Sequence, residues 1–388
     1  MPRDVARRLV QAGRSLRAIW VALALAPALI VASTAGATTG TPPPASRLQA
    51  AVASFAKAHP TFPGVVVSLS VNGDTWEGSA GTVRLGGGPA LRPDASFRIA
   101  SVTKSFVAAA MLRLVETGRV RLDAPVETYL SPSTLALLRK GGYDTHAILV
   151  RHLLRHTSGL FDYAEDPAYQ QFVLSHGRHH WTRAEQLRWA VGHGKPYSAP
   201  GEEFHYSDTG YILLGEILER ATGKGLAPAL RSLLGFDRLG LRHTYLETLE
   251  PKPAATGARA HQYYERIDST GFNPSFDLYG GGGLVSTVGD LRRFYDALFA
   301  GKVFRKPATL TLMRGAENVR APSQLGMGMF SGIYAGEACW GHSGFWGTTV
   351  LHCPRSGATI AITVNQASGF DRPSQTLVSK ILHIFRNN

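Results

Sequence analysis

Apolar residues recur in short β-type runs at both ends of the chain. Near the N-terminus, residues 65–71 and 75–83 are two such runs, and Asn72-Gly73 separates them. An Asn-Gly pair between two β-rich runs is a strong indication of a hairpin. Near the C-terminus, the pattern predicts three more strands, at residues 340–344, 348–353 and 358–365.

The remaining apolar residues follow a helical period. Residues 46–58 place Leu48, Val52, Phe55 and Ala56 on one face, which predicts an amphipathic helix. An apolar helix is expected over residues 101–116, with Gly118 as its C-cap. Further helices are predicted at residues 184–191, 211–221 and 373–385, and a glycine-rich loop at 278–284.

Strands at both ends, with a mostly helical stretch between them, predict a domain of the α/β (α+β) class. Its sheet is assembled from residues 46–100 and 310–388, helices flank the sheet, and residues 120–310 form a helical insertion. The seam between sheet and insertion is the expected place for a binding site. The length of 388 residues and the hydrophobic share of 44% allow one large or two closely packed domains.

The first 37 residues are interpreted as a signal peptide. Five arginines precede an apolar run at residues 18–31, and Ala35-Gly36-Ala37 then offers a small-x-small cleavage site. Cleavage after Ala37 leaves a linker at 38–45 and a catalytic domain at 46–388, and predicts a periplasmic or secreted protein. The alternative is a retained membrane anchor, although the run is short for a spanning helix.

The net charge gives only a weak indication of binding partners. A formal net charge of +13 is compatible with association with the anionic cell envelope. Nucleic acid is not an expected partner, because no recognition motif accompanies the charge.

The two cysteines, Cys339 and Cys353, face each other if residues 345–347 form the turn of a hairpin. A disulfide is then possible in an oxidising compartment, and two buried free thiols are the alternative.

Two Ser-x-x-Lys sequences occur, Ser101-Val102-Thr103-Lys104 and Ser54-Phe55-Ala56-Lys57. Serine and lysine three positions apart share one face of a helix, so the amine can reach the hydroxyl and activate it as a nucleophile. Ser101 opens an apolar helix, where the N–H groups of the first turn are unpaired. Ser54 lies inside the first amphipathic helix, so Ser101 is the predicted nucleophile and the earlier copy a surface pair.

Two further motifs follow in order, Tyr206-Ser207-Asp208 and Gly341-His342-Ser343-Gly344. The order Ser-x-x-Lys, Tyr-x-Asn-like and His-x-Gly resembles that of the penicillin-recognising serine hydrolases. More specifically, the chain is similar to class C β-lactamases and to the D-alanyl-D-alanine carboxypeptidase/esterase branch, from about Phe55 to the end. The resemblance implies a serine β-lactamase-like fold with an antiparallel sheet, and no metal or organic cofactor.

The resemblance also implies catalytic roles. Ser101 would attack a carbonyl carbon and become acylated. Lys104 and Tyr206 would share the proton, and which of them is the acylation base stays open. The backbone N–H groups of Ser101 and Phe345 would form the oxyanion hole.

Substrate binding is implied for four residues, two of which depart from the family pattern: Asp208, His342, Ser343 and Gly344. Ser343 would hold a carboxylate or the acyl chain, and Gly344 would let the substrate lie close to the strand. His342 replaces a lysine, and a neutral histidine binds a carboxylate less strongly. Asp208 replaces the usual Asn, and an anion beside Lys104 favours the ammonium form and shifts the role of base toward Tyr206. Both departures weaken the case for β-lactam hydrolysis.

The sequence therefore predicts an exported serine hydrolase that forms an acyl-enzyme at Ser101. Its expected partner is a small-molecule or peptide substrate, namely a D-amino-acid peptide (as for a D-alanyl-D-alanine carboxypeptidase), another amide or an ester. The alternatives are a class C-like β-lactamase and, from another class, a non-catalytic penicillin-recognising sensor or binding module.

His152 and His156 are four positions apart, but Leu153 stands where a zinc protease needs Glu. The two histidines are therefore expected to be loop and core histidines.

Overall fold

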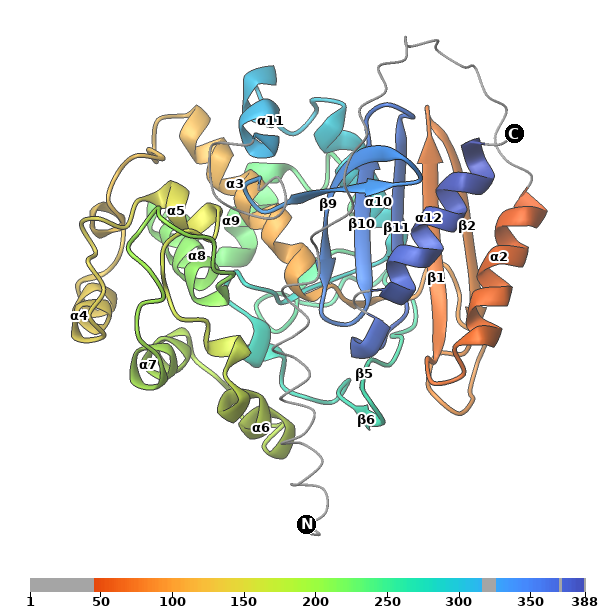
Figure 1. The fold of residues 1–388 in the computed structure, drawn as a ribbon, viewed down its shortest axis with the longest axis horizontal. Coiled ribbons are helices and arrows are strands. Elements are labelled where there is room, and N and C mark those ends of the chain that lie inside the picture. Colours follow the sequence, from red (N-terminus) through yellow and green to blue (C-terminus); the bar gives the residue numbers. More distant parts are fainter. Residues whose placement is uncertain (1–44, 316–325, 370–371, 387–388) are drawn as a thin grey trace.

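The computed structural model describes residues 45–315, 326–369 and 372–386. Its centre is a six-stranded antiparallel sheet (Figure 1), with strands in the order β2-β1-β11-β10-β9-β8. The mixed α/β class and the antiparallel sheet that the sequence predicted are confirmed. The strands are β1 (Gly64–Val71), β2 (Asp74–Gly81), β8 (Phe330–Tyr334), β9 (Glu337–Gly344), β10 (Thr348–Cys353) and β11 (Ala358–Thr363).

The two ends of the chain meet in the middle of this sheet, where β1 pairs with β11 and Val66 lies opposite Thr363. Both strands are buried along their whole length, which explains their nearly continuous apolar sequences. Helices α2 (Ala45–Ala58) and α12 (Arg372–Arg386) cover one face of the sheet, and α10 (Val288–Phe299) packs on β1, β10 and β11.

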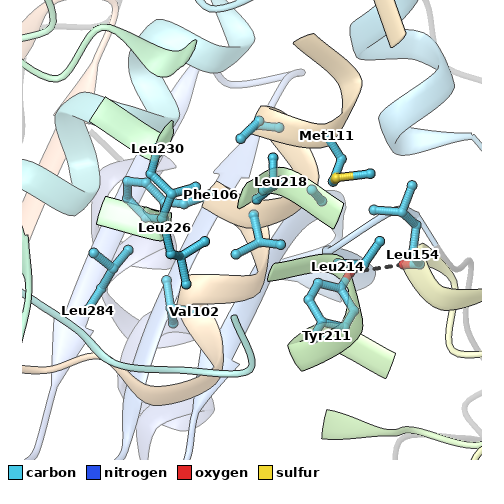
Figure 2. Packing of buried hydrophobic residues seen from close by; sticks show 14 of the residues in the cluster. Val102, Phe106, Met111, Leu154, Tyr211, Leu214, Leu218, Leu226, Leu230 and Leu284 are labelled. Carbon is cyan, nitrogen blue, oxygen red and sulfur yellow. Dashed lines mark hydrogen bonds between the residues drawn. The ribbon is translucent and has the colours of Figure 1, made fainter. Parts of the chain in front are cut away.

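A mostly helical region lies beside the sheet (Figure 1). Its centre is α3 (Thr103–Glu116), which is apolar nearly all round and accordingly buried. Figure 2 shows Phe106 of α3 among Leu226 and Leu230, and its ring stacks on Phe294 at 3.8 Å. The surrounding helices are α4 (Pro132–Lys140), α5 (Val150–Leu154), α6 (Pro167–Ser175), α7 (Arg183–His193), α8 (Asp208–Thr222), α9 (Leu226–Leu234) and α11 (Pro307–Arg314).

Several short elements were not predicted. β3 (Phe97–Arg98), β7 (Leu284–Ser286) and β4 (Tyr245–Leu246) form a three-stranded sheet, and β5 (Tyr263–Tyr264) pairs with β6 (Ile267–Asp268). Strand β8 was also missed. Runs of two to five residues are too short to show a period, so the sequence carries little signal for them.

The helix expected to open at Ser101 begins differently. Ser101 lies in a 3₁₀ turn, η1 (Ala100–Val102), and the α-helix begins at Thr103. Ala100 adopts the left-handed region, with φ 44°, which for a residue other than glycine costs roughly 1–3 kcal/mol. The turn before the nucleophile is therefore held in place by its surroundings, such as the hydrogen bond from Ile99 N–H to Leu284 O.

The β9–β10 hairpin has the register that the cysteine positions suggested. His342 lies opposite Val350 and Gly341 opposite Leu351, and Cys339 and Cys353 form a disulfide with their Cα atoms 4.1 Å apart. Of the two alternatives, the disulfide is therefore the one that the structure contains.

The proposed signal peptide and most of the linker lie outside the described residues. Among the described helices, none is both long and apolar enough to span a membrane.

Candidate active site

The side chains of Ser101 and Lys104 meet at the start of α3. Lys104 Nζ donates to Ser101 Oγ at 3.0 Å, as the spacing of three residues predicted. The Lys104 side chain is fully buried, whereas Ser101 is half-buried. A buried amine beside a partly accessible hydroxyl is the arrangement that a serine nucleophile needs.

Lys104 is held by two further acceptors. Its ammonium group forms an ion pair with Asp208 Oδ1 and donates to Gly281 O at 2.7 Å. Because an ammonium group has three N–H donors, these two acceptors and Ser101 Oγ together match all three. Lys104 must therefore release a proton before it can accept one from Ser101. The carboxylate of Asp208, which is in contact with the ammonium group, is the group that can take this proton.

The Tyr206-Ser207-Asp208 motif reaches the site because a helix begins there. Ser207 is the N-cap of α8, and its hydroxyl accepts a hydrogen bond from Gly210 N–H at 3.3 Å, as serine commonly does at a helix start. Asp208 is then the first helical residue. Tyr206 lies just before the helix, with its ring 5.0 Å from Lys104 Nζ.

The Tyr206 phenol keeps its proton. Burial raises its pKa well above the usual range, the charge of Asp208 adds to this, and a side-chain hydrogen bond with Ser101 opposes it in part. A neutral phenol beside the nucleophile is suited to donate a proton to a leaving group.

His156, expected to be a core histidine, lies against Tyr206. The two rings stack with centroids 4.2 Å apart. The Ser207 N–H donates to His156 Nδ1 at 3.1 Å, and the His205 N–H donates to His156 O at 2.9 Å. His156 thus contacts three consecutive residues, including the tyrosine. This contact was not predicted from the sequence, because the two segments are about fifty positions apart.

On β9, His342 and Ser343 point to opposite faces of the sheet, as neighbouring residues in a strand do. His342 donates from Nδ1 to Ser343 O at 2.6 Å, and burial beside Lys104 lowers its pKa to about 3. The imidazole is therefore neutral, with a lone pair on Nε2. The Ser343 hydroxyl instead shares a hydrogen bond with Thr349 at 3.0 Å, so its proposed contact with substrate remains a prediction.

Gly344 brings β9 against the turn that carries the nucleophile. A Cβ atom on Gly344 would lie 2.2 Å from Ile99 O, so glycine is required by this packing. Phe345 follows in the hairpin turn, where its ring stacks on Tyr264 with centroids 6.1 Å apart. The assignment of the Ser101 and Phe345 N–H groups to an oxyanion hole remains a prediction.

Strand β8 covers β9 only as far as Gly341, which lies opposite Phe330. Residues 342–344 therefore lie at an edge of the sheet that β8 does not pair. The ring of Phe330 is 5.2 Å from that of His342 and 6.5 Å from that of Tyr206. The unpredicted strand thus contributes an aromatic wall to the site.

Three more carboxyl groups gather near Asp208: Asp162, Glu165 and Asp277. We refer to these four residues as the carboxyl cluster. Asp162 is the N-cap of η3 (Tyr163–Glu165), Glu165 is the last residue of that turn, and Asp277 ends η4 (Pro274–Asp277). Burial, with the charge of Asp208 nearby, raises the pKa of Glu165 and of Asp277 to about 7. The pKa of Asp162 is raised well above its usual range for the same reasons.

The glycine-rich loop fits between these carboxyl groups. A Cβ atom on Gly281 would lie 2.6 Å from Asp208 Oδ1, and one on Gly282 would lie 2.2 Å from Asp277 Oδ1. From the sequence, only a glycine-rich loop was expected here. The run of glycines was the available signal, because glycine marks places where a backbone passes close to other groups.

No group of three or more His, Cys, Asp or Glu residues in the described part of the chain is arranged to hold a metal ion.

Known proteins resemble this chain over much of its length. A family model described as Beta-lactamase matches residues 52–381. Esterase EstB of Burkholderia gladioli is 33% identical over 253 residues, which is 58% of this chain and 62% of the esterase. D-alanyl-D-alanine-carboxypeptidase/endopeptidase AmpH of Escherichia coli is 28% identical, over 59% of this chain and 55% of AmpH. The chain thus spans less than two thirds of these curated relatives.

Solved structures match over more of their length. The D-amino acid amidase of Ochrobactrum anthropi SV3, complexed with L-phenylalanine amide, has a TM-score of 0.74 and 27% identity. The match covers 88% of this chain and 98% of the amidase. A D-stereospecific amidohydrolase from Streptomyces sp. has a TM-score of 0.73 and 28% identity, covering 86% of this chain and 98% of that one.

Proposed function

Because this chain belongs to the Beta-lactamase family of serine hydrolases, we propose that it is an exported enzyme that forms an acyl-enzyme at Ser101. Its substrates are D-amino-acid peptides, amides or esters. The observation that carries the proposal is the contact of Lys104 Nζ with Ser101 Oγ at 3.0 Å, in a site that also contains Tyr206.

The geometry supports a two-step reaction. The Lys104 ammonium first passes one proton to Asp208, and the Lys104–Tyr206 pair then accepts the proton of Ser101 Oγ as this oxygen attacks the substrate carbonyl carbon. Tyr206 donates a proton to the leaving nitrogen or oxygen as the bond to the carbonyl carbon breaks. Water, deprotonated by the same pair, then attacks the acyl-enzyme and releases the acid and Ser101. Hydrogen bonds from the Ser101 and Phe345 N–H groups would stabilise both oxyanions.

Two observations favour D-amino-acid derivatives over β-lactams. The matched structures named above include a D-amino acid amidase and a D-stereospecific amidohydrolase. In addition, His342 is neutral where a lactamase uses a cationic lysine, so the site lacks that charge for a β-lactam carboxylate.

Export is supported by the signal-like sequence of residues 1–37 and by the Cys339–Cys353 disulfide. Disulfides persist mainly in oxidising compartments outside the cytosol. If export is correct, the protein recovered from the periplasm or medium should begin at Thr38. Recovery of an uncut chain from the membrane fraction would favour the anchor instead.

The nucleophile is tested by labelling with a fluorophosphonate and with fluorescent penicillin. The expected result is that at least one probe labels the wild-type protein and that Ser101→Ala abolishes labelling. Ser54→Ala is the matched control, because Ser54 lies in the other Ser-x-x-Lys sequence, and it should label normally. No labelling of the wild type, or equal labelling of Ser101→Ala, would refute the assignment.

A further inference from the structure

We infer that the carboxyl cluster is the subsite for a cationic group on the acyl part of the substrate. The group it fits is the free ammonium of an aminoacyl amide, peptide or ester. This inference rests on the proposed function, because it concerns the substrate that Ser101 attacks.

The first observation is the charge balance around Lys104. Its ammonium group is paired with Asp208. Asp162, Glu165 and Asp277 lie near the same aspartate, yet none of the three forms an ion pair with another described residue. The site therefore holds more carboxyl groups than cations, and such an imbalance must be met by protons or by a ligand.

The second observation is an unsatisfied acceptor inside the cluster. Asp162 is completely buried, and its Oδ1 accepts a hydrogen bond from Ala164 N–H at 3.0 Å. Its Oδ2 is also buried and has no hydrogen-bond partner among the described residues. Buried polar atoms in native proteins nearly always have partners, so this oxygen lacks a partner that a ligand can supply.

A third observation comes from the other side of Lys104. His342 uses its Nδ1 proton for Ser343 O, which leaves Nε2 as an acceptor. That nitrogen is buried and also lacks a partner in the described structure. The site thus presents unpaired acceptors on two sides, and an ammonium or amide N–H is a better match for them than a carboxylate.

The same charges disfavour a C-terminal carboxylate near the cluster. A substrate anion would lie beside Asp208, Glu165 and Asp277, and the buried ammonium group of Lys104 is already paired with Asp208. Repulsion between like charges in a buried site is strong. The inference therefore separates an amidase or aminopeptidase type of substrate from a carboxypeptidase type.

The test compares two substrates that differ only at the amine. The values of kcat/KM are measured for D-phenylalanine p-nitroanilide and for N-acetyl-D-phenylalanine p-nitroanilide. We expect the wild type to prefer the free amine by at least about tenfold, the effect of one charge-assisted hydrogen bond. Acyl-D-alanyl-D-alanine, which has a blocked amine and a free carboxylate, should be a poor substrate.

Three variants complete the test. Glu165→Gln and Asp277→Asn keep the side-chain shape, and each should reduce the preference for the free amine about tenfold. Glu202→Gln is the control, since Glu202 is an exposed carboxylate outside the cluster, and it should keep the wild-type preference. Two independent variants guard against a single one that fails to fold.

The inference is overturned if the wild type hydrolyses both anilides equally or prefers the acetylated one. It is also overturned if folded variants change both substrates by the same factor. Labelling by fluorophosphonate is measured alongside. A wild type that labels at Ser101 but shows no preference for the amine refutes only the ammonium subsite, whereas a wild type that does not label refutes the proposed function as well.

Discussion

Lys104 and Asp208 form a buried ion pair at the start of their respective helices, and the ammonium group of that pair also contacts Ser101 Oγ at 3.0 Å. The pair therefore does two things at once. It neutralises a lysine that is completely buried, and it fixes the direction of the amine toward the nucleophile.

Replacing Lys104 alone should damage stability as well as activity. Lys104→Met leaves Asp208 without its cation, and breaking a buried pair in this way costs about 3–5 kcal/mol in free energy of unfolding. Lys104→Met with Asp208→Asn should regain most of that stability but no turnover. Urea unfolding and ester hydrolysis measure the two effects. Activity in the double variant would show that Lys104 is not part of the proton pathway.

Replacing Asp208 alone tests its effect on β-lactam chemistry. Asp208→Asn removes the anion beside Lys104, while the amide oxygen can still accept from Nζ and the amide nitrogen can donate to a substrate carbonyl. We expect acylation by a chromogenic cephalosporin to become faster by about tenfold, which corresponds to about 1.4 kcal/mol. An unchanged or slower reaction would contradict this account of the site.

His156 is predicted to position Tyr206. In His156→Phe the aromatic stack is kept, but Ser207 N–H loses its acceptor, which should cost about 1–3 kcal/mol of stability. Because Tyr206 is then less well fixed, kcat should fall more than KM changes. His152→Phe is the control, since His152 Nδ1 accepts from Leu149 N–H instead. Equal kinetic effects of the two variants would argue against a positioning role.

The carboxyl cluster predicts a stability effect with a defined sign. Burial and Asp208 raise the pKa of Glu165 from 4.5 to about 7. Between these pH values the folded protein holds a proton that the unfolded chain has lost, so this residue's contribution to stability falls as pH rises. Glu165→Gln should therefore stabilise the protein little at pH 5 and on the order of 1–3 kcal/mol at pH 8.

Thermal unfolding of both proteins from pH 5 to pH 8 measures this difference. His342 and His352 have pKa values lowered by burial to about 3 and about 4. They act in the opposite direction, because they favour the unfolded state as the pH falls below 6.5. Both histidines are present in the two proteins, so their effect cancels in the comparison. A pH-independent difference would mean that Glu165 is not buried as described.

The disulfide should stabilise the hairpin that carries His342 and Phe345. Cys339 and Cys353 are 14 positions apart, and closing a loop of that length contributes about 3 kcal/mol. Changing both cysteines to serine should lower the free energy of unfolding by about 2–4 kcal/mol. Reduction of the wild type with a thiol should give a similar loss. A double variant as stable as the oxidised protein would show that the strand pairing alone holds the hairpin.

Much of this arrangement could be predicted because it depends on local pattern. The Asn72-Gly73 turn indicated the first hairpin, and the turn at residues 345–347 placed the two cysteines opposite each other. The contact of Lys104 with Ser101 follows from helical spacing. In each case the residues that meet are close in sequence or joined by one regular element.

The rest depends on contacts between distant segments, which pattern alone does not reveal. Asp162, Glu165 and Asp277 reach the site from short 3₁₀ turns, and His156 meets Tyr206 from another loop. The hydrogen bond of Ser343 with Thr349 on the neighbouring strand was also not expected from the motif, and the assignment of Ser343 to the substrate stays a prediction. The packing of η1 against Gly344 decides which face of β9 meets the site. The sequence His342-Ser343-Gly344 alone does not show this.

The pairing of Val66 with Thr363 has a consequence for how the molecule is made. Strands from opposite ends of the chain must meet before the sheet is complete, and pairings that distant form slowly. A ribosome delivers β11 long after β1, so the nascent protein has no complete sheet and no assembled site until β11 has emerged. If the protein is exported as we propose, this order of synthesis would keep the site unassembled in the producing cell and leave the chain unfolded for passage through a translocation channel.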